Sequence, residues 1–167
     1  LTDLKRRVLV SPDDAAARYA LAEHLFGEGD HDGAEKQLTR ALALDPDHAG
    51  ARRLLARTYR AQGREVPAER TLDEAVSRDP DDAGAREEMA DLLASVRRYD
   101  EAILHMEEAL RVDAEHRSRR LRVIDLCLVR GLVARAARHI AEARRRDPED
   151  PEVASRAQAA LMYEGRA

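Results

Sequence analysis

Three kinds of side chain in this sequence could support chemistry, and each would support a different reaction. A cysteine beside a base could act as a nucleophile, and Cys127 is the single cysteine. Histidines at equivalent positions could ligate a metal ion, as His105 and His139 would. Adjacent carboxylates could suggest an acid–base pair, as at Glu87 and Glu88. Whether any of them reacts depends on the face of the element that carries it.

The surroundings of these residues favour structural roles. Cys127 follows Val123 and Ile124 at helical spacing, which places it on a core face. Neither histidine has a cysteine or carboxylate cluster at ligand spacing, and neighbouring residues of a helix do not face each other. The sequence lacks a phosphate-binding glycine loop, a nucleophile elbow and a His-Glu-x-x-His helix. We therefore predict a protein that is not an enzyme, with no catalytic residue, no metal site and no cofactor.

Composition narrows the class of partner. The 167 residues carry a formal net charge of −4, without the basic excess of nucleic-acid-binding proteins, so we expect no nucleic-acid partner. The sequence shows no apolar run of membrane-spanning length and no signal-peptide pattern, from which we expect no membrane insertion and a cytoplasmic location. Lysine occurs only at positions 5 and 36, while arginine and alanine are abundant, which is typical of GC-rich bacterial genomes.

The structural elements that carry the candidate residues repeat every 34 positions along the sequence. One set of equivalent positions holds proline in four cases of five, and two further sets hold only alanine: Pro12, Pro46, Pro80, Ala114 and Pro148; Ala34, Ala68, Ala102 and Ala136; Ala41, Ala75, Ala109 and Ala143. A fixed period of this length indicates a tandem array of one small structural unit. Each unit is too small to bury its own apolar face, so it must stack on its neighbours.

Each unit is predicted to contain two short antiparallel helices. Pro46 disfavours helix in the residue before it, so one helix ends near residue 44 and the next begins near residue 48. The next helix ends at Gly63, which supplies the left-handed residue of the turn. Glycine occupies this turn in three units and arginine in one: Gly29, Gly63, Gly131 and Arg97. Because the connections are short, successive helices must be antiparallel neighbours.

The proline, alanine and glycine positions resemble the repeat of the tetratricopeptide repeat family over residues 12–147. Together the pattern and the resemblance predict an all-α fold, a right-handed α-solenoid of antiparallel helix pairs with a 34-residue period. We expect a single domain over 1–167 with a partial N-terminal unit, four full units and a C-terminal capping helix: 1–11; 12–45, 46–79, 80–113 and 114–147; and 148–167.

The sequence departs from the family pattern in two ways. The family commonly has an aromatic residue early in the first helix of a unit, where this chain has arginine four times: Arg18, Arg52, Arg86 and Arg120. We expect the aliphatic stems of these arginines to cover apolar surface while the guanidinium groups reach water. Ala114 also replaces the proline that precedes the fourth unit.

The resemblance implies that the first helix of each unit lines a concave groove, and helical geometry selects the residues that face it. In the first three units these are Tyr19, Glu23, Phe26, Arg53, Arg57, Arg60, Glu87 and Asp91. Aromatic and arginine side chains dominate binding hot spots, and guanidinium groups hold carboxylates. We therefore predict that the groove binds a peptide or partner domain with acidic and apolar residues. The alternative is that Phe26 packs under a neighbouring helix and that Arg53 and Arg57 pair with Glu87 and Asp91.

A secondary apolar patch is predicted further along the same groove. Its members come from the fourth unit and the last helix: Leu121, Leu128, Val129, Met162 and Tyr163. Contiguous exposed apolar surface usually marks an interface. The patch could also be covered by a further part of the protein or by self-association.

We interpret the chain as a non-catalytic scaffold or adaptor for protein–protein interaction. The alternative interpretation is a regulatory or oligomerising repeat segment of a larger multidomain enzyme whose chemistry lies outside these 167 residues.

Overall fold

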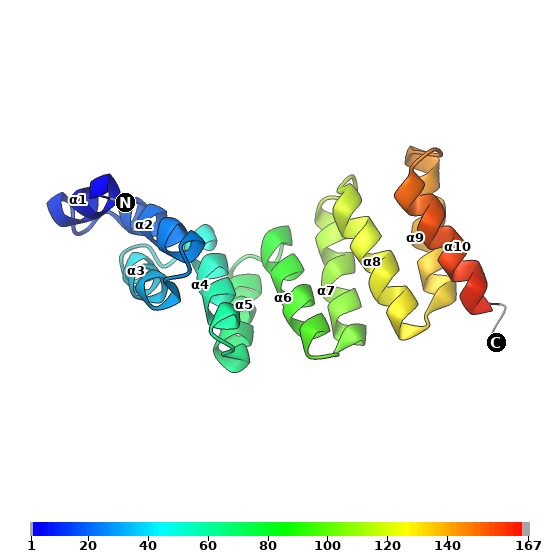
Figure 1. Cartoon of the computed structure of the whole chain (residues 1–167), viewed down its shortest axis with the longest axis horizontal. Helices are drawn as coiled ribbons and strands as arrows, with labels where there is room; N and C mark the ends of the chain where they lie inside the picture. The colour runs from blue at the N-terminus through cyan, green and yellow to red at the C-terminus, as the bar shows by residue number, and fades with distance from the viewer. Residues whose placement is uncertain (1, 165–167) are drawn as a thin grey trace. The chain divides into compact units, whose positions relative to one another are not determined.

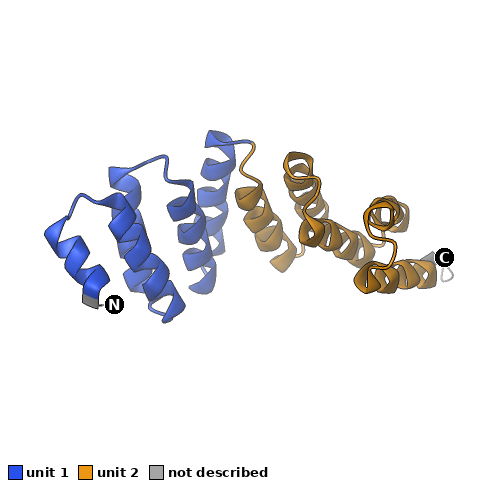
Figure 2. Cartoon of the chain, turned by 90° about the horizontal axis from the view of Figure 1, so that it is seen from above, with its two compact units in different colours: residues 1–80 blue, residues 81–167 orange. Residues whose placement is uncertain are grey.

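The computed structural model describes residues 2–164 and the side chains of residues 3–163. Ten α-helices joined by short turns make up the regular structure of this part of the chain (Figure 1). The all-α solenoid class predicted from the sequence is confirmed. The chain divides into two compact units, residues 1–80 and 81–167 (Figure 2). From here on, the first and second unit mean these two parts of the chain, and each 34-residue element pair is called a repeat. That the repeats form a single domain over 1–167 stays a prediction, and its terminal residues 1 and 165–167 lie outside the described part.

The first unit holds five helices, each of which contacts the next along the chain. They are α1 (Thr2–Val10), α2 (Ala15–Gly27), α3 (His31–Leu44), α4 (Ala49–Ala61) and α5 (Glu65–Arg78). In addition, α2 contacts α4, although α3 separates them in sequence. The face that α2 and α4 share is therefore built from two helices one repeat apart.

The second unit repeats this arrangement with its own five helices. They are α6 (Ala83–Ser95), α7 (Tyr99–Val112), α8 (Arg117–Arg130), α9 (Val133–Arg146) and α10 (Pro151–Glu164). Consecutive helices again contact each other, and α10 also contacts α8. The first helices of successive repeats begin at residues 15, 49, 83, 117 and 151, and the second helices at 31, 65, 99 and 133. The 34-residue period therefore sets every one of these helix starts.

A polar residue caps the start of each first helix. The capping side chains lie one period apart and accept a hydrogen bond from the backbone N–H three residues later: Asp14, His48, Asp82, His116 and Asp150. Such a bond satisfies one of the backbone donors that the first helical turn leaves without a partner. This set does not stand out in the sequence, because aspartate and histidine alternate at its positions.

The C-terminal ends of four first helices, α2, α4, α6 and α8, have the same type of turn. A residue with positive φ ends each of these helices, just after the C-cap in α2, α4 and α6 and at the C-cap itself in α8: Gly29, Gly63, Arg97 and Gly131. In α6, Arg97 N–H donates to Ala94 O at 3.1 Å and Arg98 N–H donates to Leu93 O at 2.8 Å. These two bonds define a Schellman motif, which requires a left-handed residue. Arg97, with φ of 64°, is the described non-glycine residue that adopts this conformation.

Within each of the two compact units, the core lies between the helices of a pair and between neighbouring pairs. Both alanine sets of the repeat are buried in all four full repeats. Four larger apolar side chains at one equivalent position of the second helices are buried beside them: Leu38, Leu72, Met106 and Ile140. Alanine lets two helix backbones approach closely, while the larger side chain fills the remaining volume.

Arginines occupy the place of the family's aromatic residue, and three of them are buried: Arg18, Arg52 and Arg120. Each donates to the backbone carbonyl of the residue six positions earlier, respectively Pro12, Pro46 and Ala114. The guanidinium groups therefore satisfy a carbonyl at the preceding turn, and the expectation that they reach water is wrong for these three. The fourth arginine of the set, Arg86, is half-buried.

Candidate functional site

The candidate site lies in the first unit, where α2 and α4 present aromatic and arginine side chains. We call it the α2–α4 face and define it as Tyr19, Glu23, Phe26, Arg53, Arg57 and Arg60. The guanidinium carbon of Arg57 lies 5.1 Å from the centroid of the Phe26 ring, which is a cation–π contact between the two helices. On α2, the Tyr19 hydroxyl donates to Glu23 Oε1 at 2.6 Å.

Both aromatic rings are held by the fold. Tyr19 and Phe26 are half-buried and pack against the core cluster around Leu38. The Tyr19 ring lies 4.7 Å from the ring of His48, and the Phe26 ring lies 5.2 Å from that of His31. A ring fixed on one side by the core loses little further freedom when a partner covers its other side. The packing of Phe26 against neighbouring helices, which was the alternative interpretation, is therefore compatible with the partial exposure of its side chain.

Electrostatics keep Tyr19 protonated. Burial, together with the hydrogen bond to Glu23, raises the pKa of Tyr19 to about 12. The positive charges of Arg53 and Arg57 oppose this shift, which places both guanidinium groups within electrostatic reach of the phenol. At neutral pH the face therefore carries a neutral hydrogen-bond donor, Tyr19, beside several cations. Arg60 is half-buried one helical turn beyond Arg57 on α4.

The two remaining predicted groove residues belong to the second unit and hold ion pairs there. Glu87 of α6 accepts from Arg119 of α8 at 2.9 Å, and Asp91 of α6 pairs with Arg122 of α8 at 2.9 Å. One repeat later, Arg156 of α10 donates to Asp125 of α8 at 2.7 Å. Acidic and basic residues 31 or 32 positions apart therefore join successive first helices. The separation of 31 or 32 residues between these acidic and basic residues is visible in the sequence and is the signal that could have predicted the ion pairs.

The secondary apolar patch is only partly exposed. Val129 of α8 and Met162 and Tyr163 of α10 are exposed, as expected. Leu121 and Leu128 are only 5% and 7% exposed, so their expected exposure is wrong. The physical reason is that α8 has neighbours on several sides, namely α7, α9 and α10, whereas α10 contacts only α8 and α9 among the described helices.

Cys127 and His139, which the sequence offered as a nucleophile and a metal ligand, pack and pair with other residues of the fold. Cys127 is fully buried, and burial raises the pKa of its thiol to about 11, so the thiol is protonated at neutral pH. His139 Nε2 lies 3.0 Å from Glu107 Oε1, and Arg135 also donates to Glu107. Among the residues described, no group of three His, Cys, Asp or Glu side chains is placed to hold a metal ion. Within the same residues, no helix has the length and apolar character needed to cross a membrane.

Comparisons with known proteins agree with the fold. A family model described as tetratricopeptide repeat matches residues 25–96 and 93–161, and a second model of the same description matches residues 4–38. No curated protein sequence matches this one.

Several solved structures are similar. TTC0263, a thermophilic protein of Thermus thermophilus, is 23% identical with a TM-score of 0.71, covering 96% of this chain and 88% of its own. YrrB is 15% identical with a TM-score of 0.76, covering 97% of this chain and 84% of its own. A repeat protein of Parabacteroides merdae is 15% identical with a TM-score of 0.80, covering 91% of this chain and 60% of its own. At these identities the likeness establishes the fold alone.

Proposed function

Because this chain belongs to the tetratricopeptide repeat family, we propose that it is a non-catalytic adaptor that binds a peptide or a partner domain over the α2–α4 face. The fold supports a protein-interaction scaffold in general terms. The finer proposal concerns where the partner binds and which chemistry recognises it. We further propose a bacterial source from the arginine- and alanine-rich, lysine-poor composition, and a cytoplasmic location from a sequence without a membrane-spanning apolar run or a signal-peptide pattern.

One observation carries the choice of face: the stacking of Arg57 on Phe26 beside the Tyr19–Glu23 hydrogen bond. Aromatic residues and arginines are the side chains most enriched in binding hot spots. Here the core fixes the rings, and the cation lies over one ring before any partner arrives. Such preorganisation lowers the entropy that binding must overcome.

The proposed ligand carries both an apolar and an acidic side chain. The apolar side chain would pack on the part of Phe26 that is not buried, and a carboxylate would accept charge-assisted hydrogen bonds from the arginines of α4. YrrB, whose structure is described as having an unusual peptide-binding site, shares the fold, which supports a peptide as the ligand class.

The test selects binding peptides from a random library against the whole chain and then measures their affinity for variants. Phe26→Ala and Arg57→Ala should each weaken a selected peptide by about 2 kcal/mol, or roughly 30-fold, if they are hot-spot residues. The affinity of the selected peptide should also fall as the salt concentration rises, because dissolved ions screen the attraction between exposed charges.

The matched control is Arg40→Ala, which removes an exposed arginine from α3 without touching the α2–α4 face. Its affinity should equal that of the wild-type chain. If Phe26→Ala, Arg57→Ala and Arg40→Ala all bound equally well with unchanged helical content, the peptide would bind elsewhere and the proposal would be wrong.

A further inference from the structure

A pocket of about 200 Å³ lies among α8, α9 and α10 in the second unit. Its lining residues come from the start of α8, the end of α9, the start of α10 and the turns beside them. Leu121, Ala143 and Val153 form its apolar lining, and all three are buried. Arg120 also lines it and is only 8% exposed, whereas rim residues such as Glu115 are exposed, so the pocket reaches the surface. We call it the Arg120 pocket.

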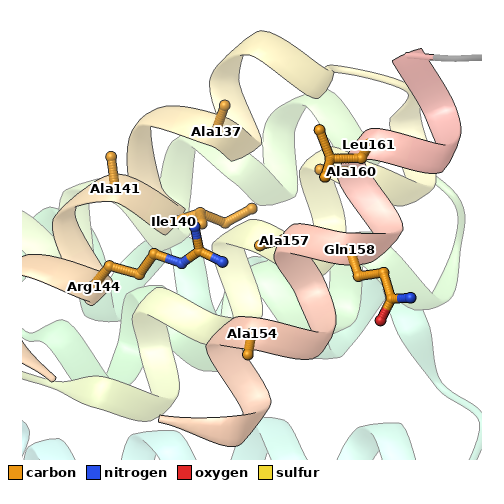
Figure 3. A pocket seen from close by; sticks show the side chains of 9 residues that line it. All are labelled: Ala137, Ile140, Ala141, Arg144, Ala154, Ala157, Gln158, Ala160 and Leu161. Atoms are coloured by element: carbon orange, nitrogen blue, oxygen red, sulfur yellow. The ribbon is translucent and has the colours of Figure 1, made fainter. Parts of the chain in front are cut away.

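The walls of the Arg120 pocket lie inside the stack of helices. A second helix of this fold packs against the first helix before it and the first helix after it, as α7 packs against α6 and α8. A larger pocket of about 410 Å³ opens elsewhere on α9 and α10, around Ile140 and Leu161, where nothing in the structure shows what covers it (Figure 3). The Arg120 pocket, in contrast, is enclosed by the second helix α9 and by both of the first helices that flank it, α8 and α10.

The guanidinium of Arg120 is only partly satisfied by the protein. Its Nη2 donates to Ala114 O at 2.5 Å, and among the described residues this is the one hydrogen bond or ion pair of the Arg120 side chain. The equivalent Arg18 donates to a backbone carbonyl and also to Gln37 Oε1 at 3.0 Å. In the fourth repeat the position of Gln37 is taken by His139, whose ring nitrogen pairs elsewhere. Because a guanidinium has five N–H donors, Arg120 retains donors that the protein does not use.

The carboxylates that line the pocket are already engaged. Glu115 pairs with Arg146, and Asp150 pairs with Arg117 at 2.7 Å. Asp147 Oδ1 accepts a backbone N–H of its own turn at 3.2 Å. The buried charge that remains without a carboxylate at this pocket is therefore positive, and an unpaired buried charge is costly.

The surroundings of Arg120 disfavour its charge. Burial is the main cause that lowers the pKa of the Arg120 guanidinium, and the positive charge of Arg146 lowers it further. At the equivalent Arg52, three carboxylates and one arginine are among the main charges that act on the pKa, whereas at Arg120 they are two carboxylates and two arginines. A bound carboxylate would offset this deficit of negative charge with charge-assisted hydrogen bonds.

We propose that the Arg120 pocket binds an aliphatic carboxylate of about the size of one amino-acid residue. The carboxylate accepts hydrogen bonds from the unused N–H groups of Arg120, and the aliphatic part packs on Leu121, Ala143 and Val153. The volume is below the roughly 300–1,000 Å³ of pockets for drug-sized molecules, which favours a small ligand. A free short-chain acid and the C-terminal residue of an aliphatic peptide share this chemistry. The inference does not depend on the function proposed for the α2–α4 face.

The probe is isovalerate, which has a carboxylate and a branched aliphatic chain. Titration of the isotope-labelled full-length polypeptide, followed by two-dimensional NMR, should give saturable shifts of the backbone amides of Leu121, Ala143 and Val153. Isovaleramide has nearly the same shape without the charge and should bind about tenfold more weakly, because the hydrogen bonds lose their ionic component. Acetate lacks most of the aliphatic chain and should also bind about tenfold more weakly.

A matched pair of variants tests the role of the guanidinium. Arg120→Met keeps an apolar stem and removes the donors, so it should weaken isovalerate binding by about tenfold or more. The control, Arg52→Met, removes an arginine of the first unit that is equally buried and donates to the equivalent carbonyl. It should bind isovalerate within about twofold of the wild type. Circular dichroism verifies the helical content of each variant, and the comparison of isovalerate with isovaleramide on the unchanged chain decides the proposal even if Arg120→Met unfolds.

The peptide acetyl-Ala-Ala-Leu with a free C-terminus distinguishes the two sources of the ligand. Binding at least as tight as that of isovalerate, and lost when the C-terminus is amidated, would support a chain end, whereas binding of isovalerate alone would support a free acid. The proposal is overturned if neither probe gives saturable shifts at the pocket, or if isovalerate and isovaleramide bind equally well. It is also overturned if a folded Arg120→Met binds isovalerate as tightly as Arg52→Met does.

Discussion

Replacing Arg97 by glycine should stabilise the second unit. Arg97 has φ of 64° at the end of α6, where the three equivalent turns have glycine. The left-handed conformation costs a non-glycine residue about 1–2 kcal/mol, while glycine loses about 0.5–1 kcal/mol more conformational freedom on folding. The difference predicts that Arg97→Gly raises the free energy of unfolding by about 0.5–1 kcal/mol.

The structure offers a control for each part of this reasoning. The Arg97 side chain is exposed and makes no hydrogen bond or ion pair with the described residues, so removing it should break no contact. Arg97→Ala removes the same side chain and charge but keeps the strained φ, so it should leave stability nearly unchanged. In the reverse direction, a Cβ added at Gly63 or Gly131 would meet no atom within 4 Å. Gly63→Arg and Gly131→Arg should therefore destabilise through φ alone, by about 0.5–1 kcal/mol.

The assay is urea unfolding followed by circular dichroism, combined with native-state hydrogen exchange of amides in α6 and α7. Repeat arrays unfold locally, so exchange resolved by helix locates the gain in stability where a single melting curve would average it. The reasoning is refuted if Arg97→Gly is no more stable than Arg97→Ala, or if Gly63→Arg and Gly131→Arg are neutral.

Three further predictions concern packing, charge and the end of the stack. Ala68→Leu and Ala102→Leu should each lower the free energy of unfolding by about 1–3 kcal/mol through overpacking at a buried helix contact, and urea unfolding equal to that of the parent would contradict this. The guanidinium of Arg117 holds the pKa of Asp150 at about 2, below the ordinary 3.8. The stabilisation is therefore complete above about pH 4 and lost as pH falls through 2, so Asp150→Asn should abolish this part of the acid dependence of helicity measured between pH 5 and 2. Deleting residues 148–167 should reduce exchange protection in α8 and α9 before α6 and α7, whereas uniform loss along the chain would contradict nearest-neighbour stacking.

The sequence alone determined the repeat and the inward face of each helix. A 34-residue period places every equivalent residue on the same face, so the buried alanines and the turn glycines could be read directly. Even the exception was visible, because Arg97 interrupts the glycine positions and the backbone there keeps the same left-handed turn. Local backbone conformation and small-residue packing depend on few neighbours, and the period specifies those neighbours.

The tertiary structure decided which long side chains meet. From the sequence, Glu87 and Asp91 were candidates for a groove or for pairing with arginines of α4, and in the structure they hold Arg119 and Arg122 of the next first helix. The buried arginines likewise found backbone carbonyls six residues earlier. A flexible charged side chain has several partners within reach, and the distance between neighbouring helices selects among them.

The tertiary structure also decided which apolar residues stay exposed. Leu128 and Met162 stand one period apart, and the sequence predicted both to be exposed, yet Leu128 is buried and Met162 is exposed. A periodic sequence assigns both residues to the same face of a first helix. Burial, however, depends on whether another helix packs against that face, and α8 has neighbours that α10 lacks among the described residues.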